Sequence, residues 1–115
     1  MKRDMEVIRE LLLWLEEQES FAVIGNQIPD FGDRPKTIGH LALLESGGFV
    51  YQSQKGVYRV SWDGYEFLDK VRDPEIWNKT KDGAAKVGSW SIKFLGDLAT
   101  GFMRAKAIEF GLPIA

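Results

Sequence analysis

The fold is decided by residues 41–68, which read LALLESGGFVYQSQKGVYRVSWDGYEFL. A leucine-rich helical segment runs into Gly47-Gly48, and glycine at this position supplies the left-handed turn that ends a helix. Two β-rich runs follow, residues 49–52 and 57–61, joined by a short polar loop that contains Gly56, which predicts a hairpin. Ser61 then stands where its hydroxyl can cap another helix, expected to reach about Arg72.

The residues before this stretch predict a helix, a short strand and a loop. Residues 4–17 repeat apolar side chains at helical spacing with acidic residues on the other face. The apolar run 21–24 predicts a strand ended by Gly25-Asn26, and turn-forming residues fill 28–35. Pro35 suits the first turn of the helix that ends at Gly47. The side chains expected to face inward from this helix and the next are Ile38, Leu41, Ala42, Leu44, Tyr65, Phe67, Leu68 and Val71.

Residues 73–115 predict two further helices. Asp73-Pro74 ends one helix and starts the next, and Ser89 is expected to cap a last helix from Trp90 to about Phe110. This last helix has more apolar residues than one packing face needs, which predicts a homodimer. The residues expected at the dimer contact are Leu95, Leu98, Phe102 and Met103. The indoles of Trp62, Trp77 and Trp90 are expected to pack rather than to serve as stacking platforms.

The order of these elements predicts an α+β, mostly helical chain. Helix, short strand, helix, Gly-Gly stop, two-stranded wing and helix together indicate a winged-helix-like domain over residues 1–73. We expect residues 74–115 to form a C-terminal helical extension that packs on the chain and could also serve dimerisation. Residues 25–35 leave little room for the second helix of a complete helix-turn-helix pair.

Three segments resemble a family of short bacterial and phage proteins that is catalogued as a domain of unknown function. They are residues 1–5 (MKRDM), 61–69 (SWDGYEFLD) and 72–81 (RDPEIWNKTK), the last being the most distinctive. The resemblance covers nearly the whole chain. It implies a phage or mobile-element setting and a helix-turn-helix-like fold, and it carries over no catalytic residues and no activity.

Composition excludes several classes of site and setting. Cysteine is absent, which removes disulfides and thiolate metal sites. We found no phosphate-binding glycine loop and no histidine–carboxylate spacing beside a nucleophile, so we expect no enzyme, no cofactor and no metal site. Charged residues interrupt the early sequence, and no run of about 18 uncharged apolar residues occurs, so we expect a cytoplasmic chain with no membrane partner.

Charge distribution leaves two functional hypotheses open. Residues 33–60 contain four cations and two acidic residues, a mildly positive island, whereas residues 62–75 contain two cations and five acidic residues. The leading hypothesis is a phage- or prophage-type regulator that binds double-stranded DNA as a dimer. Its candidate DNA contacts are Arg34, Lys36, Thr37, Gly39, His40, Lys55 and Arg59. The rival hypothesis is a protein-interaction module that docks on a host protein and has lost DNA binding. For His40, a solvated or partly packed side chain is the commoner alternative to a DNA contact.

Overall fold

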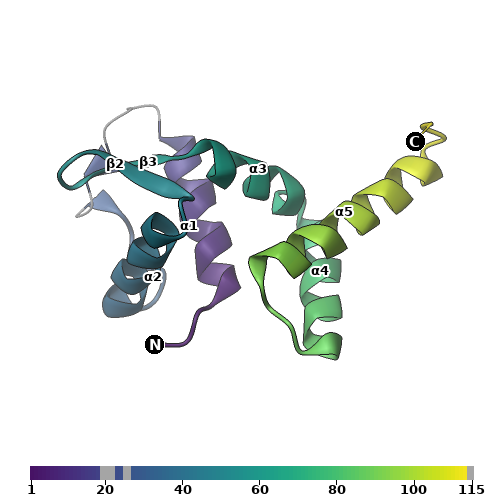
Figure 1. Ribbon diagram of the computed structural model, residues 1–115, viewed down its shortest axis with the longest axis horizontal. Helices are drawn as coiled ribbons and strands as arrows, with labels where there is room; N and C mark the ends of the chain where they lie inside the picture. Colours follow the sequence, from purple (N-terminus) through teal and green to yellow (C-terminus); the bar gives the residue numbers. More distant parts are fainter. Residues whose placement is uncertain (19–22, 25–26, 114–115) are drawn as a thin grey trace. The chain divides into compact units, whose positions relative to one another are not determined.

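The computed structural model describes residues 1–18, 23–24 and 27–113 (Figure 1). Within these residues five helices and three strands form. They are α1 (Met5–Glu17), β1 (Val23–Ile24), α2 (Arg34–Ser46), β2 (Val50–Gln54), β3 (Val57–Val60), α3 (Trp62–Val71), α4 (Pro74–Val87) and α5 (Ile92–Glu109). The predicted α+β, mostly helical class is therefore confirmed. Among the described residues, no helix combines the length and the apolar character needed to cross a bilayer.

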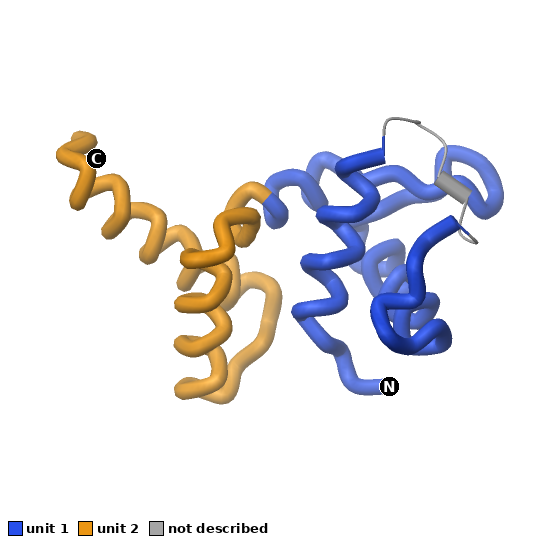
Figure 2. The backbone as a smooth tube through the Cα atoms, turned by 180° about the vertical axis from the view of Figure 1, so that it is seen from behind, with its two compact units in different colours: residues 1–68 blue, residues 69–115 orange. Residues whose placement is uncertain are grey.

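The chain divides into two compact units, residues 1–68 and 69–115 (Figure 2). The boundary predicted from the sequence lies after Asp73, a few residues further on. In unit 1 the three strands form an antiparallel sheet in the order β1-β3-β2. Helix α1 packs against α2 and β3, and α2 also packs against β2. This arrangement is compatible with a winged-helix-like fold in which β2 and β3 form the wing.

The connection from β1 to α2 has the shortened form that the sequence predicted. Residues 27–33 form turns and no α-helix. Residues 21–22 of the expected strand and the expected stop at 25–26 lie outside the described residues. Asp33 caps α2, because its carboxylate accepts a hydrogen bond from the Lys36 N–H at 3.1 Å, and Pro35 occupies the first turn.

The turn between the end of α2 and the start of the wing contains the left-handed glycine that the sequence predicted. Gly48 has φ +83, a left-handed conformation that side chains with a Cβ rarely adopt. The N–H of Phe49 then donates to the Leu44 carbonyl at 2.9 Å, which satisfies one of the last helical acceptors. From this turn β2 begins at Val50, which is buried and pairs with Val60 of β3.

The start of α3 is fixed tightly against the start of β2. The Ser61 hydroxyl caps the helix by accepting from the Gly64 N–H at 3.1 Å, and the Ser61 N–H donates to the Phe49 carbonyl at 3.0 Å. A Cβ built on Gly64 would lie far inside van der Waals contact of the Phe49 carbonyl oxygen, and 2.7 Å from a Val60 methyl group. The predicted Ser-x-x-Gly start of this helix is confirmed, and glycine is required there for close approach rather than for its φ.

Unit 2 is built around an antiparallel pair, α4 and α5 (Figure 1). Asp73 caps α4 by accepting from the N–H groups of Glu75 and Ile76, and Gly88 ends it at φ +82. The expectation that Ser89 caps the last helix was wrong. Ser91 is the cap, since its hydroxyl accepts from the Phe94 N–H at 3.2 Å, and α5 begins at Ile92. A hydroxyl at either position satisfies the same sequence pattern.

Three side chains expected to face inward lie on the surface instead, and one of them is Ala42 on α2. Ile38 on α2 is 43% exposed and Tyr65 on α3 is 42% exposed. In both helices the buried set is shifted around the axis, to Thr37, His40, Leu41 and Leu44 on α2 and to Gly64, Phe67, Leu68 and Val71 on α3. Among the indoles, Trp77 is buried as expected, whereas Trp62 is 78% exposed.

Candidate interaction surfaces

His40, a candidate DNA contact, lies inside unit 1. Its side chain is fully buried, with Nδ1 2.8 Å from the Lys36 carbonyl and Nε2 2.8 Å from the backbone N–H of Asp4. A carbonyl accepts and an N–H donates, so Nδ1 carries the proton and Nε2 accepts, which defines a neutral ring. The ring therefore fastens the start of α1 to α2, and it does not face a DNA groove.

Asp4 completes this cluster through its carboxylate. One oxygen accepts from the Glu6 N–H at 3.0 Å as the cap of α1, and the other accepts from Lys36 Nζ at 2.8 Å. The hydrogen bond from Lys36 is the main reason that the pKa of Asp4 lies below its usual value. We call Asp4, Lys36 and His40 the Asp4 cluster.

Three other candidates on α2 are also occupied by contacts within unit 1. The Thr37 side chain is buried, and its hydroxyl lies within hydrogen-bond distance of the carbonyls of Asp30 and Asp33. Arg34 donates to the Ile28 carbonyl and to an Asp30 carboxylate oxygen at 3.3 Å. Gly39 is half-buried, and the Met1 thioether lies over it. Of the α2 candidates, Thr37 and His40 therefore face the core.

Part of the surface that α2 presents to solvent is apolar, and it is flanked by the exposed Ser46 and by the side chains of Arg34 and Lys36, which are 36% and 38% exposed. The exposed apolar residues of the helix, Pro35, Ile38, Ala42 and Leu43, form what we call the outer face of α2. This face contains no charged side chain. Such a helix surface suits contact with another apolar surface better than contact with base edges, which are read through hydrogen-bond donors and acceptors.

The wing retains one exposed cation among the candidates. Lys55 lies at the tip and is exposed, whereas Arg59 on β3 is half-buried and has an interaction partner. The Gln52 side chain links the wing to α2, because it donates to a Glu45 carboxylate oxygen at 2.6 Å. It also accepts from the Gly56 N–H in the turn of the wing at 2.7 Å.

Lys2 and Arg3 are cations that the sequence analysis did not single out. Both are exposed, and they immediately precede Asp4, whose bonds to Lys36 and His40 hold this part of the chain beside α2. These two cations are placed near α2 only by the long-range hydrogen bonds of Asp4 to His40 and Lys36. Helical periodicity within a single segment does not contain that information.

The predicted dimer residues on α5 divide into internal and exposed groups. Leu95 is fully buried, and Leu98 is half-buried with a methyl group 3.3 Å from the position of a Cβ on Gly83 of α4. Phe102 is half-buried and Met103 is 41% exposed. The amino-terminal half of α5 therefore packs within unit 2, which makes Leu95 unavailable to a partner, and its apolar surplus lies further along.

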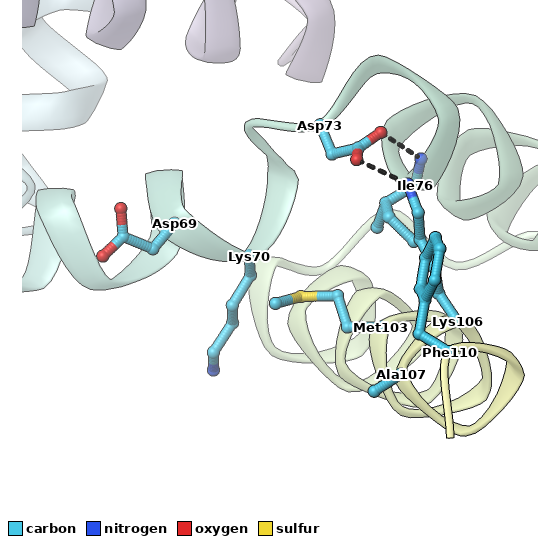
Figure 3. A pocket seen from close by; sticks show the side chains of 8 residues that line it. All are labelled: Asp69, Lys70, Asp73, Ile76, Met103, Lys106, Ala107 and Phe110. Carbon is cyan, nitrogen blue, oxygen red and sulfur yellow. Dashed lines mark hydrogen bonds and ion pairs between the residues drawn. The ribbon is translucent and has the colours of Figure 1, made fainter. Parts of the chain in front are cut away.

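The apolar residues near the end of α5 border a groove of about 270 Å³ in unit 2 (Figure 3). Ile76 of α4 and Met103, Ala107 and Phe110 at the end of α5 supply its apolar lining. Its charged lining residues are Asp69, Lys70, Asp73 and Lys106. Because two of these groups are acidic and two are basic, the groove favours neither an anionic nor a cationic ligand.

Lys106 links the two helices of unit 2 at this groove. Its Nζ donates to Asp73 at 2.9 Å and to Glu75 at 3.3 Å. The hydrogen bonds from Lys106 are the main reason that the pKa values of Asp73 and Glu75 lie below their usual values. The same bonds raise the pKa of Lys106. The ion pairs are solvent-exposed, so they adjust stability rather than determine the fold.

These shifts predict an acid-dependent contribution from Lys106. Because the folded pKa values of Asp73 and Glu75 are depressed, their contribution is present above the unfolded values and is lost as pH falls through the folded ones, below about pH 4. Urea unfolding of Lys106→Met should therefore show a smaller loss of stability on acidification than the parent chain. Lys86→Met, which removes the exposed Asp82 pair, is the matched control. An unchanged acid dependence in Lys106→Met contradicts the assignment.

Within the described residues, no group of three or more His, Cys, Asp or Glu side chains is placed to hold a metal ion. The exposed features of this part of the chain include the outer face of α2, the wing and the groove of unit 2.

Comparison with known proteins identifies the family. A family model described as hypothetical protein DUF2513 matches residues 2–91, which is most of the chain. The chain belongs to the DUF2513 family. An uncharacterized protein from Haemophilus influenzae is 35% identical over 92 residues, which cover 70% of this chain and 76% of that protein. The predicted resemblance to a family of unknown function is thereby confirmed. No solved structure matches.

Proposed function

We propose that this DUF2513 protein is a non-enzymatic protein-interaction module that contacts its partner through the outer face of α2. The observation that carries the proposal is the apolar, uncharged character of that face, with Ile38 43% exposed and Leu43 36% exposed. Aliphatic side chains grouped on one exposed helix face lose water when a partner covers them, and this drives association.

The cations around α2 support the same proposal. Lys36 pairs with Asp4 at 2.8 Å, and Arg34 bonds to Ile28 and Asp30. Contact with phosphates would compete with these internal partners, and the log–log salt dependence of DNA affinity scales with the number of phosphates neutralised. Few cations on unit 1 are left for that purpose.

The test compares two aspartate substitutions at exposed aliphatic positions. Ile38→Asp places a charge on the outer face of α2, whereas Val87→Asp makes the same change on α4, where Val87 is 68% exposed. Immobilised full-length chains would be exposed to extract of the source cells, and captured proteins would be identified by mass spectrometry. We expect a defined partner on the parent and on Val87→Asp, with recovery on Ile38→Asp reduced about tenfold. Equal recovery on all three proteins would contradict the proposal.

Binding of double-stranded DNA by a dimeric regulator is the second candidate, favoured by a different observation. The sheet order β1-β3-β2 and the α2–wing connection are compatible with a winged-helix-like arrangement, and the cations Lys2, Arg3 and Lys55 of unit 1 are exposed, Lys55 at the wing tip. The phage or prophage setting and the homodimer stay predictions.

A mobility-shift assay on upstream DNA distinguishes the two candidates. If DNA is the ligand, Lys55→Glu combined with Lys2→Glu should abolish the shift at about 50 mM salt, while Ile38→Asp leaves it intact. If the protein-interaction proposal holds, the parent chain gives no salt-sensitive shift at micromolar concentration. Light scattering on the same samples reports the oligomeric state.

A further inference from the structure

The outward face of α3 combines an exposed indole with acidic side chains. Trp62, Tyr65 and Glu66 are exposed at helical spacings of three and four residues, on the side opposite Phe67 and Leu68, which are buried. The indole of Trp62 is 78% exposed, and the phenol of Tyr65 is 42% exposed. We call Trp62, Asp63, Tyr65 and Glu66 the α3 face.

The exposed indole has little part in holding the fold together. Helix α3 is anchored by the Ser61 cap, the close approach of Gly64 to β2, and the buried side chains Phe67 and Leu68. A tryptophan side chain left mostly in water is uncommon, because its apolar area favours burial, and tryptophan is among the residues most enriched at the centres of protein contacts. Trp62 is therefore available to a partner without loss of the core.

The charges beside Trp62 are acidic and unpaired. Asp63 and Glu66 are exposed, and in the part of the chain that the structure describes neither has a cation within ion-pair distance. The position of Asp63 in the first turn is accounted for by the helix dipole. Glu66 lies beyond the first turn, so the dipole does not account for it.

We propose that the α3 face binds an arginine-bearing segment of a partner protein. A guanidinium group stacks on the face of Trp62 and donates to the carboxylate of Glu66, with Asp63 adding a second acceptor nearby. Arginine fits this combination because its planar cation stacks on aromatic rings and donates two parallel hydrogen bonds to a carboxylate. The carboxylates repel phosphate, so nucleic acid does not fit. This surface is separate from the outer face of α2, and the proposal does not depend on that one.

The test is a titration of the isotope-labelled full chain, followed through the indole N–H signals of tryptophan. The probe is a short oligo-arginine peptide, with oligo-lysine and oligo-glutamate peptides of equal length for comparison. We expect the Trp62 signal and the backbone amides of residues 62–66 to shift with oligo-arginine. Oligo-lysine should bind several-fold more weakly, since it lacks the planar group, and oligo-glutamate should give no shift.

Three variants make the outcome decisive. Trp62→Ala should weaken oligo-arginine binding about tenfold with an unchanged melting temperature, because the indole is exposed. Asp63→Asn combined with Glu66→Gln should weaken it at least as much. Glu17→Gln combined with Glu109→Gln makes the same charge change at exposed sites elsewhere and should have little effect.

Several results would overturn the proposal. Unchanged affinity in Trp62→Ala, equal losses in the two charge-matched double variants, or equal binding of oligo-lysine would each show diffuse electrostatic attraction instead of a site. A shift of the Trp62 signal that depends on protein concentration, with no peptide present, would assign the α3 face to contact with a second copy of the chain.

Discussion

Replacing Gly64 with alanine is expected to unfold unit 1 or to lower its free energy of unfolding by at least about 4 kcal/mol. The added methyl group would overlap the Phe49 carbonyl oxygen and lie 2.7 Å from a Val60 methyl group. Neither neighbour can easily move away, because Phe49 bonds to Leu44 and Ser61 and Val60 pairs with Val50. Urea unfolding followed by circular dichroism would measure the loss.

The matched control is Gly101→Ala in α5. Gly101 is also helical, but a Cβ there has no heavy atom within 4 Å. The same substitution should stabilise unit 2 by about 0.5–1 kcal/mol, because alanine loses less backbone entropy in a helix than glycine does. If Gly64→Ala were stabilised as much as Gly101→Ala, the inference that Gly64 of α3 lies in close contact with β2 would be wrong.

Replacing His40 with alanine is expected to cost about 3 kcal/mol, the second of the two largest effects. The substitution leaves a cavity at a fully buried position and removes the acceptor of the Asp4 N–H. It also loosens the tie that holds the start of α1 against α2. Thermal or urea unfolding gives the magnitude, and an amide of Asp4 that exchanges faster with solvent locates the damage.

Lys55→Ala is the control for the His40 variant. Both residues were candidate DNA contacts, but Lys55 is exposed on the wing, and its replacement should change stability by less than about 0.5 kcal/mol. If both substitutions changed stability equally little, His40 would have no structural role. It would then again be a candidate for contact with DNA.

The fold was largely predictable where sequence signals act over a few residues. Gly47-Gly48, the hydroxyl of Ser61 and Pro35 each specify a local backbone geometry, and each lies where the sequence analysis placed it. The shortened connection before α2 followed from its turn-forming composition. Near Ser89 and Ser91 two hydroxyls offered the same cap, and local chemistry did not distinguish them.

The candidate site was less predictable, because it depends on which side of each helix meets the core. On α2 the sequence pattern placed Ile38 in the core and left His40 as a DNA contact or a solvated or partly packed side chain, whereas Ile38 is exposed and His40 is fully buried. The burial of His40 follows from a partner 36 residues away, the Asp4 backbone, which satisfies the imidazole that burial would otherwise penalise. No spacing within α2 reports that hydrogen bond.

The locked imidazole also gives the protein an internal reporter. His40 is the single histidine of the chain, so its ring nitrogens give one unambiguous pair of ¹⁵N resonances. With Nδ1–H directed at the Lys36 carbonyl and Nε2 accepting from Asp4, the ring proton should exchange slowly enough to be observed directly. Its signal can follow the integrity of unit 1 during any titration, without a label on the surfaces under study.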